Sequence, residues 1–417
     1  MLQTTSSVEP ASVADTSCAI VGGGPGGAVL ALLLARRGVE VTLLESHPDF
    51  DREFRGDTLH PSVMEIMSDL GLADRLLELR HSKLRQATIQ TAEGPFTPVD
   101  FSRLSTRFPY ITVMPQKSFL EFVTAEAARY PGFRLVMGAR VVDLINDGNS
   151  VGAVRGVRYE SSNEEHELRA KLTVGADGRG SRTRRLSGFE PVKTSPPMDV
   201  LWFKLPKHSG DPEGLVGRFG GGRIAILLDR DDHWQAGYVM PKGTFPDLRR
   251  AGVEELWRRF DALAPEFAGR ARGIADWHQV SLLSVESSRC RRWFKPGLLL
   301  IGDAAHVMSP VGGVGINYAV QDAITAANLL ADPLARGGLR TAHLAAVQAR
   351  REIPTRVIQR LQTLVQNRVL APALSASPDD PVSVPPMLRA LPRIPVLRGL
   401  PARVIGYGLW PSRPRGL

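Results

Sequence analysis

Three glycines and one acidic residue near the N-terminus have the spacing of a turn that binds a nucleotide. Gly22, Gly24 and Gly27 separate two apolar stretches, and Glu45 ends the next one, about 20 residues further on as in dinucleotide-binding units. The first glycine permits a tight turn, the second lets the backbone approach a pyrophosphate, and the third lets a helix pack closely on a strand. The acid can accept hydrogen bonds from a ribose. These residues predict a dinucleotide site, for either NAD or FAD.

This chemistry requires a strand, a helix and a second strand around the glycines. We expect a buried strand at residues 18–22, a helix with an apolar face at 26–37 and a strand at 39–44. A parallel unit of this kind places the helix start beside the turn, with its free N–H groups and the positive end of its dipole. The sequence therefore predicts the beginning of a Rossmann-type domain.

Two later stretches also contain a strand that ends at an acid. Asp177 and Gly178 follow the apolar residues 172–175, and Asp303 follows another apolar run. An acid at the carboxyl end of a parallel strand lies where ligands of α/β sheets bind, and it can accept from a sugar-alcohol hydroxyl. The loop after Asp303 leads into a long apolar helix, so its backbone N–H groups can meet a ligand ring. This loop is marked by Pro310, Gly312, Gly313, Gly315 and Asn317.

In this order, the three stretches resemble those of the group A flavoprotein monooxygenases, the FAD-dependent aromatic hydroxylases typified by para-hydroxybenzoate hydroxylase. The resemblance covers about residues 17–335. It implies non-covalently bound FAD, with Glu45 on the adenosine ribose and Asp303 on the ribityl chain. It also implies that the 312–317 loop follows the pyrimidine edge of the flavin, and that Asp177 supports binding of FAD or of the nicotinamide nucleotide.

Two further cofactor residues follow from the same resemblance. Arg55 stands where the family places an arginine near the FAD pyrophosphate, and Gln116 stands where many members carry Arg and others Gln. The alternative interpretations are a surface ion pair for Arg55 and a helix-start residue for Gln116.

The resemblance also implies a reaction. NAD(P)H would reduce FAD, and the reduced flavin would react with O₂ to give a C4a-hydroperoxide that hydroxylates a phenolic or polyketide-like aromatic small molecule. The cofactor carries the chemistry while the protein supplies position, charge and exclusion of water. We assign no catalytic residue from the sequence.

The predicted fold class is α/β. We expect a three-layer Rossmann-type FAD-binding domain with a mostly parallel sheet, an inserted substrate domain with a mixed or antiparallel sheet, and a C-terminal helical segment. Alternating apolar and polar residues with aromatics between 199 and 241 indicate the inserted sheet. The expected boundaries are a disordered leader at 1–16, the FAD domain at 17–80, 110–190 and 285–335, the substrate domain at 81–109 and 191–284, and a helical region with a basic tail at 336–417.

Four residues of the expected inserted sheet are candidates for the substrate pocket. Trp202, Trp234 and Tyr238 could line a closed apolar pocket over the flavin, and Arg223 could lie near it. Aromatic residues at alternating positions can equally form the core of the sheet.

Composition excludes several other classes. The 417 residues carry a net charge of +9, but the basic residues are dispersed, which argues against nucleic-acid binding. No apolar run is long enough to span a membrane, and we regard peripheral contact by the basic tail as less favoured than packing. Two distant cysteines suggest neither a disulfide framework nor a metal site, so a cytoplasmic location is the default expectation.

Three alternatives to the hydroxylase share the opening fingerprint. A flavin-dependent halogenase is disfavoured because a Trp-x-Trp-x-Ile-Pro stretch is absent from the sequence. A non-oxygenating reductase or dehydrogenase of the same fold, acting on an apolar or lipid-like substrate, stays open. So does a non-redox protein in which FAD is structural.

Overall fold

The protein has two lobes, each built around a large β-sheet. The parallel strands of the first lobe position all three predicted motifs. The computed structural model describes residues 12–51, 57–91, 94–148, 152–212, 214–377 and 398–416. Strand β1 lies between β11 and β2, with Val21 opposite Gly175 and Leu44. The parallel order is β20 (Leu298–Leu300), β11 (Glu164–Gly175), β1 (Ser12–Val21), β2 (Val41–Glu45) and β8 (Phe133–Met137). The antiparallel β19 (Phe294–Lys295) adds an edge.

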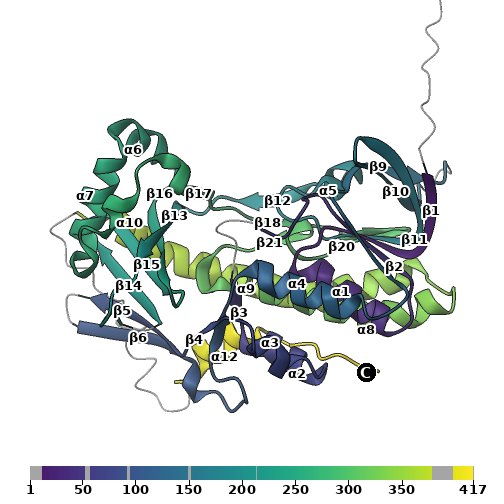
Figure 1. Ribbon diagram of the computed structural model, residues 1–417, viewed down its shortest axis with the longest axis horizontal. Helices are drawn as coiled ribbons and strands as arrows, with labels where there is room; N and C mark the ends of the chain where they lie inside the picture. The colour runs from purple at the N-terminus through teal and green to yellow at the C-terminus, as the bar shows by residue number, and fades with distance from the viewer. Residues whose placement is uncertain are drawn as a thin grey trace, which may run out of the picture.

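Helices cover one face of this sheet and a β-meander covers the other, which gives the expected three layers (Figure 1). The helices are α1 (Pro25–Arg36), α4 (Gln116–Ala127) and α8 (Gly315–Ala335). Residues 26–35 of α1 are all buried because the helix packs against the sheet, α4 and α8 at once. The meander is formed by β9 (Arg140–Asn146), β10 (Val154–Ser161) and the first part of β11.

The first strand begins earlier than the sequence predicts. Residues 12–16, which we expected in a disordered leader, belong to β1 and pair with residues 166–170 of β11. Because their side chains are polar or small, the apolar pattern of the sequence does not indicate a strand here. The strand is stabilised instead by its backbone hydrogen bonds to β11. Residues 1–11 of the expected leader lie outside the described part of the chain.

A seven-stranded mixed sheet forms the second lobe (Figure 1). Two segments of chain supply it, since β5 pairs in parallel with β14 while the other neighbours pair antiparallel. The order is β17 (Ser281–Ser284), β13 (Met198–Pro206), β16 (His233–Pro241), β15 (Arg223–Asp229), β14 (Leu215–Gly220), β5 (Gln86–Thr91) and β6 (Gly94–Asp100). Helices α6 (Phe245–Ala251) and α7 (Val253–Leu263) pack on one face. The predicted combination of two sheets is confirmed, while the domain boundaries themselves stay a prediction.

Two small three-stranded sheets and three further short helices belong to neither of the large sheets. One sheet has the order β3 (Thr58–Leu59), β7 (Ile111–Val113) and β4 (Ser82–Leu84), and the other has β12 (Pro191–Thr194), β18 (Ser287–Cys290) and β21 (His306–Val307). Helices α2 (Pro61–Asp69) and α3 (Ala73–Leu77) follow β3, and α5 (Arg182–Leu186) follows β11.

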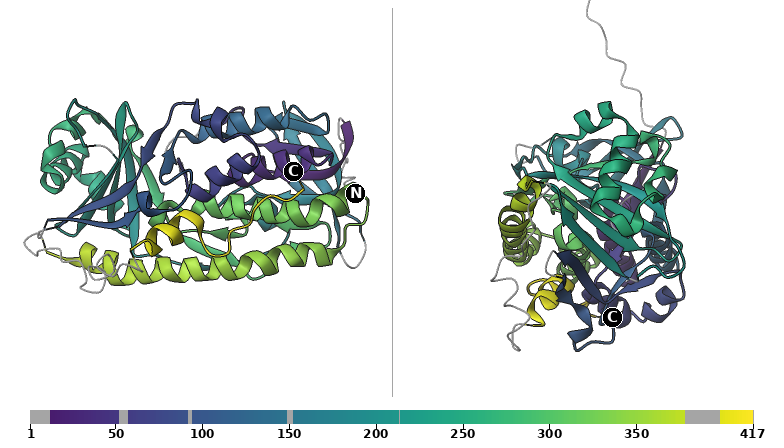
Figure 2. Two further views of the ribbon diagram at one scale, coloured as in Figure 1. Left: turned by 90° about the horizontal axis from the view of Figure 1, so that it is seen from below. Right: turned by 90° about the vertical axis from the view of Figure 1, so that its left-hand side faces the viewer.

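A long C-terminal helix runs along both lobes (Figure 2). This helix, α9 (Thr341–Val365), continues through a π-helical turn, Gln366–Leu370, into α10 (Ala371–Ser375). After residues 378–397, which the structure does not describe, α12 (Leu400–Tyr407) contacts β6 and α2.

The described end of the basic tail packs on the protein. Arg413 pairs with Glu65 and Asp69 of α2, and the Ser412 amide donates to the Gln321 side chain of α8 at 2.5 Å. Residues 389–397 of the predicted tail lie outside the described part of the chain. None of the helices in the described ranges combines the length and apolar composition needed to cross a membrane.

A buried charged cluster joins α8 and α9 to the turn that follows β20. The Asp322 carboxylate accepts from His306 Nε2 at 2.6 Å, from Arg351 Nε at 2.7 Å and from the Gly302 amide at 3.0 Å. Burial alone would raise the pKa of Asp322, but His306 and Arg351 hold it below its ordinary value. Held by these contacts, the Asp322 carboxylate fixes the backbone immediately before Asp303 through the Gly302 amide.

Asp322→Asn should destabilise the fold strongly, because it leaves the buried Arg351 guanidinium without a compensating charge. We expect a loss of about 3–5 kcal/mol in the free energy of unfolding, measured by urea denaturation at neutral pH. Asp332→Asn is the matched control, since Asp332 is 67% exposed beside Arg37 and exposed pairs contribute about 0–1 kcal/mol. Equal effects of the two variants would contradict the structural role of the cluster.

Candidate active site

The turn between β1 and α1 is built from backbone contacts that leave no room for side chains. Gly22 has φ +104°, and a Cβ atom there would lie 2.6 Å from the Ala176 carbonyl oxygen. A Cβ on Gly27 would lie 2.0 Å from the Gly22 carbonyl oxygen. At Gly24, by contrast, no described atom lies within 4 Å of the Cβ position. The two outer glycines therefore serve packing, and the middle one faces space that a pyrophosphate can occupy.

The start of α1 is free to bind an anion. Gly24 is its N-cap, and within the described residues no side chain caps the helix and no acid stands in its first turn. Glu45 is 2% exposed at the end of β2, and its carboxylate accepts from the Gly23 amide at 2.8 Å and the His47 amide at 3.0 Å. The acid predicted for the ribose thus lies directly beside the glycine turn.

The Asp177 loop supports its neighbours. The Asp177 carboxylate accepts from the Thr183 amide at 2.9 Å and from the Ser181 hydroxyl at 2.5 Å. The buried Arg184 guanidinium donates to the Ala304 carbonyl at 2.9 Å, and Arg179 pairs with Asp303 at 3.4 Å. Asp177 therefore orders the loop and the start of α5, and Arg184 links the loop to the turn at Asp303.

The third motif meets the first at one alanine of α8. Cβ atoms built on Gly26 and Gly302 would lie 3.3 Å and 3.1 Å from the Ala319 Cβ. The three predicted stretches therefore converge at the carboxyl edge of the parallel sheet, with Asp303 about 30% exposed at its side chain. This is the edge where α/β sheets bind their ligands.

The loop before α8 offers a second helix start. Gly312 and Gly313 have φ values of +80° and +63°, which suit glycine, and α8 begins at Gly315 without a side-chain cap from any described residue. Asn317 is fully buried and its Oδ1 accepts from the Ser62 hydroxyl, while its Nδ2 lacks a hydrogen-bond partner within the described ranges. These donors fit the polar pyrimidine edge of a flavin.

Two residues that the sequence did not single out as cofactor ligands lie against this loop. Thr58 Oγ1 donates to the Gly313 carbonyl at 3.4 Å. His60 is fully buried, with Nδ1 2.7 Å from the Ile405 carbonyl, and burial lowers its pKa. Since a carbonyl only accepts, Nδ1 carries the proton of the neutral ring. The sequence feature that could have indicated this contact is the cluster of polar residues at the start of α2, namely Thr58, His60 and Ser62.

Of the two further predicted cofactor residues, the structure describes Gln116 but not Arg55. Arg55 lies outside the described residues. Gln116 opens α4, and its amide donates to the Asp57 carboxylate at 3.0 Å. Asp57 also pairs with Arg230 of the second lobe at 2.9 Å. A contact between the Gln116 side chain and FAD stays a prediction.

The second sheet places three of the four predicted pocket residues on its helix-covered face. Trp234 and Tyr238 are fully buried on the face that α6 and α7 cover, and Trp234 packs edge-to-face on Phe267 at 5.3 Å. Arg223 shares the strand face of Ala225 and Leu227, two members of the same core. Because successive residues of a strand point to opposite faces, these three side chains point away from the opposite, α10-facing surface.

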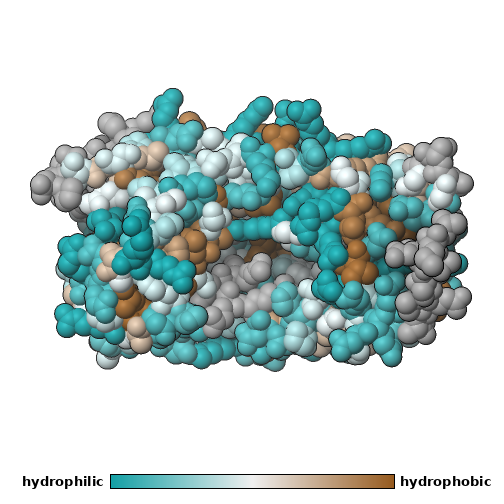
Figure 3. Space-filling view, turned by 90° about the horizontal axis from the view of Figure 1, so that it is seen from above, coloured by the Kyte–Doolittle hydropathy of each residue, from teal (hydrophilic) through white to brown (hydrophobic). Residues whose placement is uncertain are grey.

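Trp202 lies on the opposite face, where an apolar cluster reaches the loop before α8. Its indole covers Gly237, so that a Cβ there would lie 2.8 Å from Cζ3 of the ring. The cluster includes Val311, the residue after Pro310. The members from the sheet are Met198, Val200, Trp202, Phe219, Ile224, Ile226, Val239 and Leu283. In the space-filling view, a recess between the lobes shows hydrophobic residues (Figure 3).

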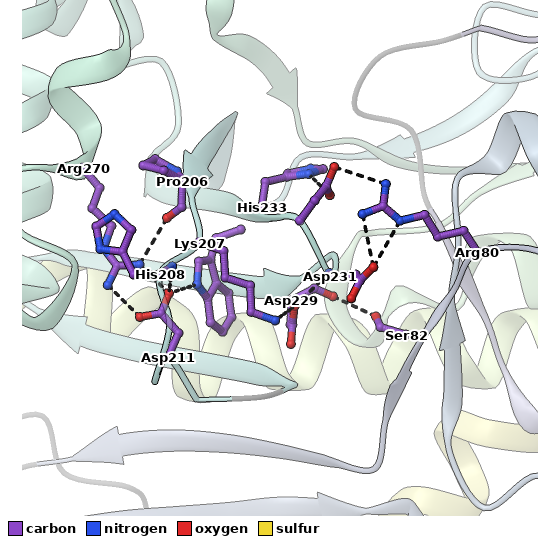
Figure 4. Close-up of polar contacts among 12 residues, drawn as sticks. Arg80, Ser82, Pro206, Lys207, His208, Asp211, Asp229, Asp231, His233 and Arg270 are labelled. Carbon is purple, nitrogen blue, oxygen red and sulfur yellow. Dashed lines mark hydrogen bonds and ion pairs between the residues drawn. The ribbon is translucent and has the colours of Figure 1, made fainter.

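A polar cavity of about 250 Å³ lies at another end of the same sheet. Asp229 accepts from Lys207 at 2.8 Å through its carboxylate and from Ser82 at 2.9 Å through its carbonyl, and Arg80 pairs with Asp231 nearby (Figure 4). The charges of Lys207 and Arg80 are thus balanced by Asp229 and Asp231. The polar lining of the cavity suits polar groups of a ligand. It is lined by His81, Ser82, Lys83, Leu84, Val113, Lys207, Gly214, Leu228, Asp229 and Asp231.

Comparison with known proteins decides between the dinucleotides. Residues 15–361 match the family described as FAD binding domain. The chain belongs to this family. It is an FAD-dependent oxidoreductase, and this match, together with the monooxygenase relatives below, confirms the resemblance to the group A flavoprotein monooxygenases drawn from the three motifs.

Two relatives of this flavoprotein differ in their named reactions. It is 32% identical over 402 residues to the 6-methylpretetramide 4-monooxygenase of Streptomyces rimosus, covering 96% of this chain and 94% of that one. It is 26% identical over 342 residues to the digeranylgeranylglycerophospholipid reductase of Methanothrix thermoacetophila, covering 79% of this chain and 81% of that one. Four further monooxygenase relatives are longer, and this flavoprotein matches 59–61% of their length.

Solved structures share the fold. The anhydrotetracycline hydroxylase OxyS from Streptomyces rimosus superimposes with a TM-score of 0.74 at 23% identity, covering 97% of this chain and 78% of that chain.

Gly24→Ala and Gly27→Ala should separate cofactor binding from folding in this flavoprotein. Gly24→Ala should keep its thermal stability and weaken FAD binding by about tenfold or more, because the added methyl occupies the pyrophosphate space. Gly27→Ala should lose about 1–3 kcal/mol of folding free energy through overpacking. Thermal unfolding of the apoprotein and FAD titration measure the two effects, and the reverse pattern would contradict the assignment.

Glu45→Ala should weaken FAD binding by about 1–3 kcal/mol, the range for a hydrogen bond to a charged group. Glu40→Ala is the control, because Glu40 is an exposed acid just before the same strand. FAD titration by fluorescence quenching gives both dissociation constants. An unchanged constant for Glu45→Ala would place the ribose elsewhere.

Proposed function

We propose that this flavoprotein is a monooxygenase that uses NAD(P)H and O₂ to hydroxylate an aromatic small molecule of phenolic or polyketide type. The observation that carries the proposal is the apolar cluster that joins the sheet face around Trp202 to Val311. Val311 belongs to the loop at residues 310–317, which we call the flavin loop. An aromatic ring held there would lie beside the flavin in a site from which water is excluded. The balanced reaction takes substrate, NAD(P)H, H⁺ and O₂ to hydroxylated substrate, NAD(P)⁺ and water.

The residues that would hold FAD are spread over the whole carboxyl edge of the parallel sheet. The start of α1 at Gly24 receives the pyrophosphate, Glu45 the adenosine ribose and Asp303 the ribityl chain. The loop from Pro310 through Gly313 and Gly315 to Asn317 borders the pyrimidine edge. Bound FAD supplies hydride acceptance from the nicotinamide nucleotide and activation of O₂.

The chain's own contribution is electrostatic and steric. The start of α8, which no described side chain caps, would supply partial positive charge to a bound flavin that becomes negative on reduction. The Trp202 indole and its aliphatic neighbours keep water from the reacting atoms. His60 presents a neutral ring whose protonated Nδ1 is held by the Ile405 carbonyl.

The relatives favour the aromatic substrate over the lipid-like one. The 6-methylpretetramide monooxygenase matches over almost its whole length and at higher identity than the lipid reductase. The reductase relative nevertheless keeps a second candidate, a non-oxygenating reduction of an apolar or lipid-like substrate on the same scaffold.

Isotope labelling distinguishes these reactions. The purified yellow protein, supplied with NADPH or NADH and a panel of phenols and polyketide aromatics under ¹⁸O₂, should place one labelled oxygen in a product. Reaction in H₂¹⁸O with unlabelled O₂ is the control and should leave the product unlabelled. Substrate reduction without label would favour the reductase, and a protein that binds no FAD would remove both candidates.

A further inference from the structure

A polar stripe lies on the buried side of α9, beside the apolar Leu344, Val347, Pro354 and Ile358, although helices normally bury an apolar stripe alone. Its residues recur at three- and four-residue spacing, so they lie on one side of the helix. Each is less than a tenth exposed. The stripe consists of Gln348, Arg351, Thr355, Gln359, Gln362 and Gln366.

The glutamines of this stripe bind polar groups of the segments beside α9. Gln362 Nε2 donates to the Ser309 carbonyl at 2.9 Å and to the Val311 carbonyl at 2.8 Å, the two carbonyls that flank Pro310. Gln366, the first residue of the π-helical turn, donates to the Ser309 hydroxyl. Side-chain amides thus supply hydrogen bonds that a strand or helix would otherwise give this irregular loop.

The orientation of the Gln362 amide follows from its surroundings. Both groups that it meets are carbonyl oxygens, which only accept, so the NH₂ group must face them. Within the described ranges its own Oε1 is buried without a hydrogen-bond partner. The residue is therefore held in place for its two donor bonds, at the cost of an unsatisfied acceptor.

Gln359 makes the same kind of contact one turn earlier, but outside the flavin loop. Its Nε2 donates to the Ser288 carbonyl at 2.9 Å and to the Val307 carbonyl at 3.1 Å, and its Oε1 accepts from Arg289 at 3.0 Å. Gln359 and Gln362 are thus both buried amide donors. They differ in the backbone carbonyls that accept their hydrogen bonds, which belong to the flavin loop and its approach only for Gln362.

We propose that Gln362 is a positioning residue for the flavin, because its two hydrogen bonds set the place of Pro310 and of the loop that leads to the start of α8. The proposal rests on the proposed function, in which this loop borders the pyrimidine edge of FAD. The π-helical turn that begins at Gln366 widens α9 at the level of the loop, and such turns often mark functional sites.

The test compares Gln362→Met with Gln359→Met in the full-length protein. Both variants should lower the thermal midpoint, and Gln359→Met at least as much, since it loses three hydrogen bonds against two. Only Gln362→Met should alter the absorption spectrum of bound FAD and raise the FAD dissociation constant, by about tenfold. It should also divert more NAD(P)H oxidation to H₂O₂. Flavin properties that match between the variants, or that follow the thermal midpoint alone, would overturn the proposal.

Gln362→Glu keeps the side-chain shape if the methionine variant does not fold. Its ionised carboxylate faces two carbonyl oxygens and holds neither, whereas its protonated form can donate one hydrogen bond. The flavin spectrum of Gln362→Glu should therefore approach that of the wild type as the pH is lowered, and a spectrum without this response would overturn the proposal. Wild-type protein that binds no FAD would instead remove the proposed function.

Discussion

The contact of backbone with backbone at the β1–α1 turn is the constraint on which the rest of the site depends. Gly27 approaches the Gly22 carbonyl, and Gly22 approaches Ala176, the residue after the neighbouring strand β11. Because these contacts admit no side chain, the start of α1 is fixed against the sheet with its N–H groups directed at open space. Ala319 then brings α8 to the same place, so two helix starts of matching polarity share one sheet edge. Without the close approach of α1 and α8 at Ala319, Glu45 and Asp303 would not lie at one ligand site.

The parts of the site that could be predicted from the sequence are those where backbone geometry dictates residue type. The glycines and the acids at strand ends are of this kind, because few other residues meet the local requirement. The fold class followed from the same residues. The leader was predicted too long because residues 12–16, a mixture of polar and small apolar residues, form ladder bonds without continuing the apolar run of the strand.

Other features depend on long-range packing that a local pattern does not contain. Alternation along β13, β15 and β16 identified two faces of the sheet, but only the position of α7 determines that Trp234 and Tyr238 lie in the helix-covered core. The glutamines of α9 were missed for a related reason. Their periodic spacing was visible, but its meaning depends on the irregular backbone that they meet, which comes from a segment about 50 residues earlier.

The Gly237–Trp202 pair helps to set the width of the proposed substrate site. The indole lies against a residue that has no side chain, and any larger residue at position 237 must push the ring toward the flavin loop or out of the cluster. A substitution at this one position in the middle of β16 can therefore narrow or reshape the space that the Trp202 face of the sheet offers to a ring system.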